Sequence, residues 1–193
     1  MSLVICVCNV DYSVMVGDGR MIEFDTNGKQ IRVVNENTQK VFKVNDFVSV
    51  GYAGDPIPAV FALKTLENFD KNMISLELTA KIIQESLMKT KANELGVKIV
   101  ISGRNQYGNM VLYLLNTKFG YEYRKFLPLK NNPVYSCLAH DQNKVAPILT
   151  KYINESIKGM SETKLRSCLK KCIEEVSEVD DSVNNNIKEV IIK

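Results

Sequence analysis

The 193-residue sequence lacks the features that mark several large classes of protein. Its longest apolar runs, such as residues 97–103, fall far short of the roughly 20 residues that a membrane-spanning helix needs. Its first residues show no charged segment followed by an apolar one, so nothing predicts secretion. Lys and Arg number 25 against 22 Asp and Glu, without the basic stripe typical of nucleic-acid binding. We therefore predict a cytoplasmic protein with neither membrane nor nucleic acid as a partner.

Residues that commonly bind metals are also scarce. His140 is the only histidine, and the five cysteines form no C-x-x-C pair. Cys6 and Cys8 would share one face of a strand, and Cys168 and Cys172 one face of a helix. An odd number of cysteines without a secretion signal indicates reduced thiols. Metal binding by these pairs is one interpretation, but we predict that the thiols pack in the core and that no metal or cofactor is used.

What the sequence does contain is secondary structure grouped by type. Apolar and alternating runs predict strands, Asn27-Gly28 predicts a hairpin turn, and Asp55 followed by Pro56 predicts the start of a helix. The predicted strands are 3–10, 14–18, the two arms of 21–34, 40–44, 47–51, 97–103, 110–116, 121–129, 133–139 and 186–193. The predicted helices are 55–66, 76–95, 141–156 and 161–176. Such grouping favours an α+β protein whose helices cover antiparallel sheets.

The second residue is a candidate nucleophile. Removal of Met1 would leave Ser2 at the N-terminus, where its hydroxyl and a free α-amine belong to one residue. Such an amine has a reference pKa of roughly 7.7–8.0 and can act as a base for the hydroxyl near neutral pH. The simpler interpretation is that Ser2 is a small residue placed before a strand.

Three further residues bear on this hypothesis. Asp18 follows the second strand and would return to the chain start if the first two strands form a hairpin. Lys40 opens the predicted strand 40–44. Gly54 ends a strand directly before a helix. Backbone N–H groups at such a glycine and helix N-terminus favour negative charge, as an oxyanion hole requires. Taken singly, Asp18 is more typical of a turn cap, Lys40 of a solvated strand residue and Gly54 of an ordinary turn.

Together these segments resemble the β-type subunits of the proteasome and their bacterial HslV-type relatives, which are N-terminal-nucleophile hydrolases. The segments are VGDGR at 16–20, TQKVFKV at 38–44, GYAGD at 51–55 and VDDSVNNNIKEVII at 179–192. The spacings from Ser2 to Asp18 and from Lys40 to Gly54 match those of the family. The likeness runs from residue 2 to the end and is strongest over 2–66. It implies one domain over 1–193 with a four-layer αββα sandwich of two antiparallel sheets flanked by helix pairs.

The resemblance also implies roles for individual residues. Ser2 would be the nucleophile, where the family normally has Thr, and its α-amine would be the base. Lys40 would lower the pKa of the hydroxyl, Asp18 would orient Lys40, and the Gly54 amide would hold the oxyanion.

Two more residues receive supporting roles in the same way. Asp180 would support the N-terminal residue, and Tyr52 would line the pocket for a substrate side chain. The sequence departs from the family at Ala139 and His140, where a Gly-Ser-Gly segment is usual, and at Asn184–Asn186, where small residues are common.

The implied function is hydrolysis of peptide bonds in peptides or unfolded proteins by a homo-oligomeric ring, with an ATP-dependent unfoldase as a possible partner. Phe61, Leu66 and Ile74 are candidates for contacts between subunits, although burial in the core is the commoner outcome for such residues. Two other functions stay open: a catalytically inactive assembly subunit, and an amidase acting on a small amide.

Overall fold

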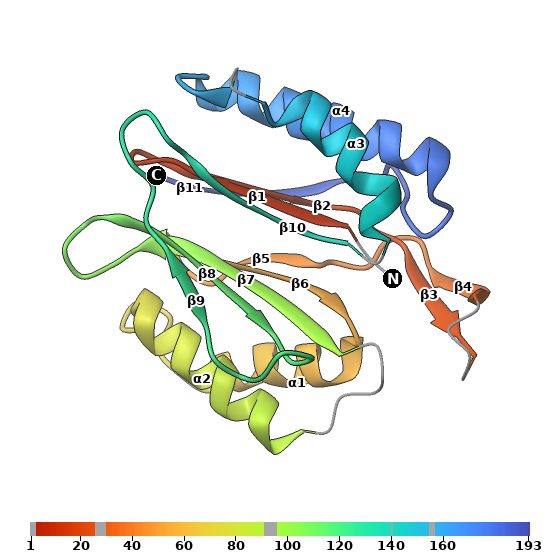
Figure 1. The fold of residues 1–193 in the computed structure, drawn as a ribbon. Helices are drawn as coiled ribbons and strands as arrows, with labels where there is room; N and C mark the ends of the chain where they lie inside the picture. Colours follow the sequence, from red (N-terminus) through yellow and green to blue (C-terminus); the bar gives the residue numbers. More distant parts are fainter. Residues whose placement is uncertain (1–2, 26–29, 91–95, 140, 155–156) are drawn as a thin grey trace.

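The computed structural model describes residues 3–25, 30–90, 96–139, 141–154 and 157–193, and every statement below concerns these residues. They form a mixed α+β structure, which confirms the predicted class (Figure 1). Within the described residues, no helix combines the length and apolar character needed to cross a membrane.

The first sheet contains both ends of the described chain. It has four strands in the order β10-β1-β2-β11, and all neighbouring pairs are antiparallel. The strands are β1 (Val4–Cys8), β2 (Ser13–Gly17), β10 (Val134–Leu138) and β11 (Lys188–Ile192). Every residue of β1 and β2 is buried, which explains why these segments, apart from Ser13, are apolar instead of alternating.

The second sheet is antiparallel with five strands in the order β5-β6-β7-β8-β9. They are β5 (Val41–Lys43), β6 (Val48–Gly54), β7 (Val97–Arg104), β8 (Met110–Asn116) and β9 (Arg124–Phe126). A core cluster between the two sheets includes Val4, Met15, Val100 and Leu112. A Cβ atom on Gly51 would lie 2.7 Å from the Met15 sulfur, so glycine is required for this close approach.

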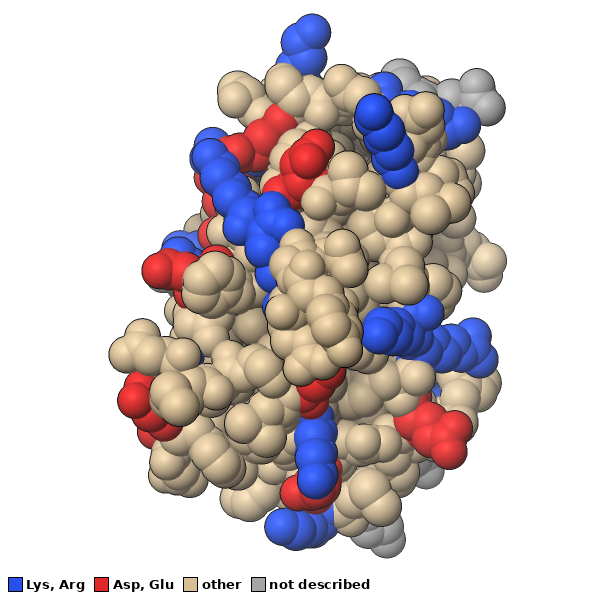
Figure 2. Space-filling view, turned by 90° about the vertical axis from the view of Figure 1, so that its left-hand side faces the viewer, with Lys and Arg blue, Asp and Glu red and all other residues tan. Residues whose placement is uncertain are grey.

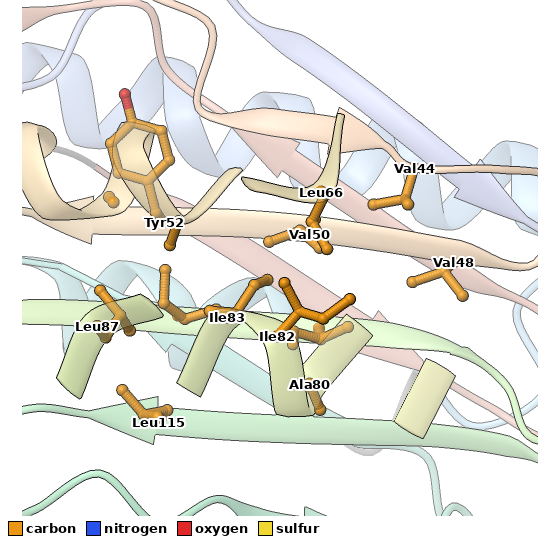
Figure 3. Close-up of a cluster of buried hydrophobic side chains, with 14 of the residues drawn as sticks. Val44, Val48, Val50, Tyr52, Leu66, Ala80, Ile82, Ile83, Leu87 and Leu115 are labelled. Carbon is orange, nitrogen blue, oxygen red and sulfur yellow. The ribbon is translucent and has the colours of Figure 1, made fainter. Parts of the chain in front are cut away.

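Two helix pairs cover the outer faces of the sheets (Figure 1). Helices α1 (Pro56–Leu66) and α2 (Leu76–Lys89) pack on the five-stranded sheet, where they bury the cluster drawn in Figure 3. Helices α3 (Gln142–Tyr152) and α4 (Glu162–Val179) pack on the four-stranded sheet. Asp55 and Ser161 cap α1 and α4 as their positions in the sequence indicate.

A separate two-stranded sheet projects from the body (Figure 1). It pairs β3 (Met21–Phe24) with β4 (Gln30–Asn35), as the hairpin motif predicts, while Asn27-Gly28 itself lies outside the described residues. All six residues of β4 are exposed. On the face shown in Figure 2, basic and acidic side chains lie interspersed.

Some boundaries differ from the sequence predictions. Helix α2 ends at Lys89, because Thr90 is already extended and its hydroxyl donates to carbonyls of the last turn. The predicted helix runs on to residue 95, and residues 91–95 lie outside the described part of the chain. The three candidate contact residues differ in burial. Leu66 and Ile74 are 4% and 3% exposed, so both side chains pack in the core of this chain. Phe61 is half exposed.

The predicted burial of the cysteines is confirmed for Cys6, Cys8 and Cys172, and the remaining two are partly buried.

Candidate active site

The hairpin of β1 and β2 places Asp18 beside the beginning of the chain, as predicted. The Leu3 amide donates to Asp18 Oδ1 at 2.7 Å, and the Asp18 amide donates to the Leu3 carbonyl at 3.1 Å. Ser2 lies outside the described residues, so the structure gives the position of its neighbour Leu3 only. The Asp18 carboxylate is therefore bound one residue away from the predicted nucleophile.

Lys40 and Asp18 form a fully buried ion pair. Lys40 Nζ lies 2.7 Å from Asp18 Oδ1 and also donates to the Arg20 carbonyl, and the two residues are 1% and 0% exposed. The Arg20 amide donates to the other carboxylate oxygen at 2.8 Å. Burial lowers the pKa of the Lys40 ammonium from its usual 10.5, and the nearby Asp18 charge opposes that shift. A pair this deeply buried carries a desolvation cost that offsets much of its Coulombic attraction.

Gly54 ends β6 with a backbone conformation that requires glycine. Its φ is +98°, and a Cβ atom there would lie 2.2 Å from the Gly96 carbonyl oxygen. The next residue, Asp55, donates its amide to that same carbonyl at 2.8 Å and caps α1. The Tyr52 amide donates to the Lys40 carbonyl, which places Lys40 beside the same strand. Gly54 thus stands at a helix N-terminus on the strand that neighbours Lys40, and its oxyanion role stays a prediction.

The last loop packs against the segment around Asp18. Asp180 is 6% exposed, follows α4, and accepts the Ser182 amide at 2.9 Å. Asn184 accepts the Gly19 amide at 2.9 Å and donates to the Glu36 side chain at 2.6 Å. The side-chain amide of Asn184 thus fixes the segment that carries Asp18.

Arg20 reinforces the same region. Its guanidinium contacts Glu36 at 3.0 Å and donates to the Asp181 carbonyl at 2.7 Å. In the sequence, the asparagine run at 184–186 stands out only as a departure from the family. Neither the hydrogen bonds of Asn184 nor those of Arg20 are predicted from the sequence.

Tyr52 packs in the core on the helix side of the five-stranded sheet. It is 2% exposed and stacks on Phe42, with ring centroids 6.2 Å apart. Figure 3 shows its ring at the edge of the cluster, with the hydroxyl directed away from the labelled aliphatic side chains. Burial raises the pKa of Tyr52 to about 12, and the Asp18 charge contributes. Its place in a substrate pocket stays a prediction.

A second lysine spans the space between the two sheets near the end of β6. Lys98 lies on β7, and its Nζ donates to the Ala139 carbonyl at 2.7 Å. Lys98 is not among the residues predicted from the sequence, although a lysine inside the apolar run 97–101 is a usable signal.

His140 lies outside the described residues. Within the described part of the chain, no three His, Cys, Asp or Glu side chains are grouped as a metal site.

Comparison with known proteins shows likeness in fold. No protein-family model matches the chain, and no curated protein sequence matches it. A crystal structure of eukaryotic HslV from Trypanosoma brucei superposes with a TM-score of 0.66, covering 99% of this chain and 99% of that chain at 14% sequence identity. Likeness at this identity establishes an HslV-like, proteasome-type fold.

Proposed function

We propose that this chain is a proteasome-type peptidase subunit that hydrolyses peptide bonds with Ser2 as nucleophile after removal of Met1. The HslV-like fold supports this function. The observation that carries the proposal is the Asp18 carboxylate, which binds both Lys40 Nζ and the Leu3 amide at 2.7 Å. One carboxylate thus ties a buried ammonium to the residue that follows the proposed nucleophile.

The proposed reaction has two steps. The α-amine of Ser2 takes the hydroxyl proton as the oxygen attacks the peptide carbonyl carbon, and the buried Lys40 charge favours the developing alkoxide. The carbon–nitrogen bond then breaks, the leaving amine takes the proton, and an ester on Ser2 remains. Water attacks the ester carbon as one of its protons passes to the α-amine. The bond between that carbon and the Ser2 oxygen then breaks, and the α-amine returns the proton to this oxygen, which releases the acid and restores Ser2.

Other residues serve these steps in the proposal. The Gly54 amide donates to the oxyanion, because it lies at the N-terminus of α1 next to the strand that Lys40 adjoins. Asp180 supports the N-terminal residue from the last loop. Tyr52 borders the pocket for a substrate side chain, as the resemblance to the family implies.

The proposal extends to the assembly. We infer that the two sheets and two helix pairs of Figure 1 form the αββα sandwich of N-terminal-nucleophile hydrolases. As in that family, we expect a homo-oligomeric ring in the cytoplasm that receives peptides or unfolded proteins, with an ATP-dependent unfoldase as partner. Among the three candidate contact residues, the half-exposed Phe61 is the one available to a neighbouring subunit.

The test uses protein that begins at Ser2, compared with protein that retains Met1. The first should hydrolyse fluorogenic peptides, whereas Ser2→Ala and Lys40→Ala should abolish the activity with the fold intact by circular dichroism. Lys43→Ala is the matched control, since Lys43 is three residues along the chain from Lys40, in an exposed pair with Asp46, and its loss should leave the rate unchanged. Activity on small amides alone would favour an amidase, and an inert protein, alone and with an unfoldase, would favour an assembly subunit.

A further inference from the structure

Lys98 crosses the space between the sheets at the edge where β1 begins and β6 ends. In its sheet it lies between Ala53, the neighbour of Gly54, and Asn116. Its ammonium donates to the carbonyl of Ala139 in the other sheet. Ala139 directly follows Leu138, which pairs with Val4 at the start of β1. Lys98 is therefore close to both strand ends that carry the proposed catalytic groups.

The charge of Lys98 has no counter-charge in the described part of the chain. Lys98 is in no ion pair within 4.0 Å there, and its hydrogen-bond partner is a neutral carbonyl. Its ionisable neighbours are Lys118, a like charge, and Cys137, a thiol whose pKa burial raises to about 12 and which is therefore neutral near pH 7. Burial also lowers the pKa of Lys98. A partly buried cation in this state gains from an anionic ligand, because the ligand supplies the missing charge.

A hollow opens beside β8, the strand that neighbours the one carrying Lys98. Its volume is about 320 Å³, and it is lined by Leu114, Asn116, Phe119, Glu122, Tyr123 and Arg124. Asn116 is the direct cross-strand partner of Lys98, so the hollow begins one strand away from the Lys98 backbone. Arg124 adds a second cation to its wall, and Glu122 is its one carboxylate. The space is large enough for an amino-acid side chain or the end of a peptide.

We propose that Lys98 binds a carboxylate of the peptide substrate and thereby sets a preference for acidic groups near the bond that is cut. This inference rests on the proposed peptidase function. The carboxylate has two possible sources, an acidic side chain or the C-terminus of a short peptide, and both present the same group to the ammonium.

The experiment compares matched peptides on protein that begins at Ser2. One series replaces Glu by Gln at each position flanking the scissile bond, and a second series compares the free C-terminal acid with its amide. A charge-assisted hydrogen bond predicts a preference of about tenfold or more in kcat/KM for the charged member of one series. Lys98→Met should reduce the ratio to near one, and Lys98→Arg should retain most of it.

Lys125→Met is the matched control. Lys125 lies in the same sheet but contacts the Tyr113 ring on the helix side, 5.8 Å from its centroid, so its loss removes the same charge from the other face. The ratio should stay at its wild-type value in this variant. The proposal is overturned if the wild type shows no preference in either series, or if the preference survives in Lys98→Met. If Lys98→Met does not fold, loss of the preference in Lys98→Arg overturns the proposal.

A binding measurement separates this inference from the proposed function. Calorimetry with Ser2→Ala protein reads the affinity for the same peptides without any reaction. If hydrolysis fails but the charged peptides bind about tenfold more tightly through Lys98, the peptidase proposal falls and the carboxylate site stands. If hydrolysis occurs and neither rate nor affinity depends on the carboxylate, the site falls and the peptidase proposal stands.

Discussion

Two lysines enter the space near the start of the chain, and they differ in what balances their charge. Lys40 is 1% exposed and its ammonium contacts the Asp18 carboxylate at 2.7 Å. Lys98 is partly buried, and its ammonium contacts the neutral Ala139 carbonyl at the same distance. Burial lowers the pKa of both lysines, but only Lys40 has a nearby carboxylate that opposes the shift.

The two lysines differ in whether a carboxylate of the described residues contacts the ammonium. The pair of Lys40 and Asp18 is complete within the protein, which suits the proposed role of Lys40 as a fixed charge beside Ser2. Lys98 lacks such a partner in the described residues, which suits a charge that is matched only when substrate is bound. The contrast predicts different responses to substitution of the two lysines and their partners.

The largest effect is expected from Asp18→Asn. The substitution keeps an acceptor for the Leu3 amide but removes the carboxylate that contacts the buried Lys40 ammonium at 2.7 Å, which costs about 3–5 kcal/mol. Urea unfolding measures the loss. The control is Asp46→Asn, which breaks an exposed pair with Lys43 and should cost less than about 1 kcal/mol. Equal losses in the two variants would contradict the buried pair.

A smaller effect is expected when both partners are replaced. Asp18→Asn with Lys40→Met removes the buried ammonium together with the carboxylate that contacts it, so the double variant should lose less stability than the two single variants summed. The coupling should reach about 1–3 kcal/mol in a double-mutant cycle measured by the same urea titrations. Additive losses would show that the two side chains do not interact.

Lys98→Met is expected to change stability less than Asp18→Asn does. It removes a hydrogen bond to a backbone carbonyl and at the same time removes a desolvated cation, so the net change should stay within about 1 kcal/mol. Thermal unfolding of wild type and variant side by side measures it. A loss as large as that of Asp18→Asn would mean that Lys98 supports the fold itself.

The smallest expected effect is a pH dependence that Lys98 contributes. Because its pKa is lowered in the folded protein, the unfolded chain holds more protons between that lowered pKa and 10.5. Wild-type stability relative to Lys98→Met should therefore rise as pH increases through this window and fall as pH decreases through the folded pKa. Denaturant titrations at several alkaline pH values measure this difference, and the opposite slope would contradict the lowered pKa.

The sequence predicts what depends on local pattern and spacing. It places Asp18 at the chain start through a hairpin, and it predicts the cap of α1 at Asp55. Both follow from short-range geometry. It misses the Lys98 contact because that contact joins residues 41 positions apart in different sheets. It misses the Asn184 bonds for the same reason, and it extends α2 too far because no local rule weighs Thr90 against a continuing apolar pattern.

The most direct test of the central claim is covalent labelling followed by intact-mass and peptide mass spectrometry. The reagent is an electrophilic peptide that forms a stable adduct only with a residue carrying both a hydroxyl and a free α-amine. The account predicts one adduct per chain, located on Ser2, in protein that begins at Ser2, and none in protein that retains Met1 or carries Ser2→Ala. No adduct on the Ser2-starting protein, or equal labelling with Met1 retained, would contradict it.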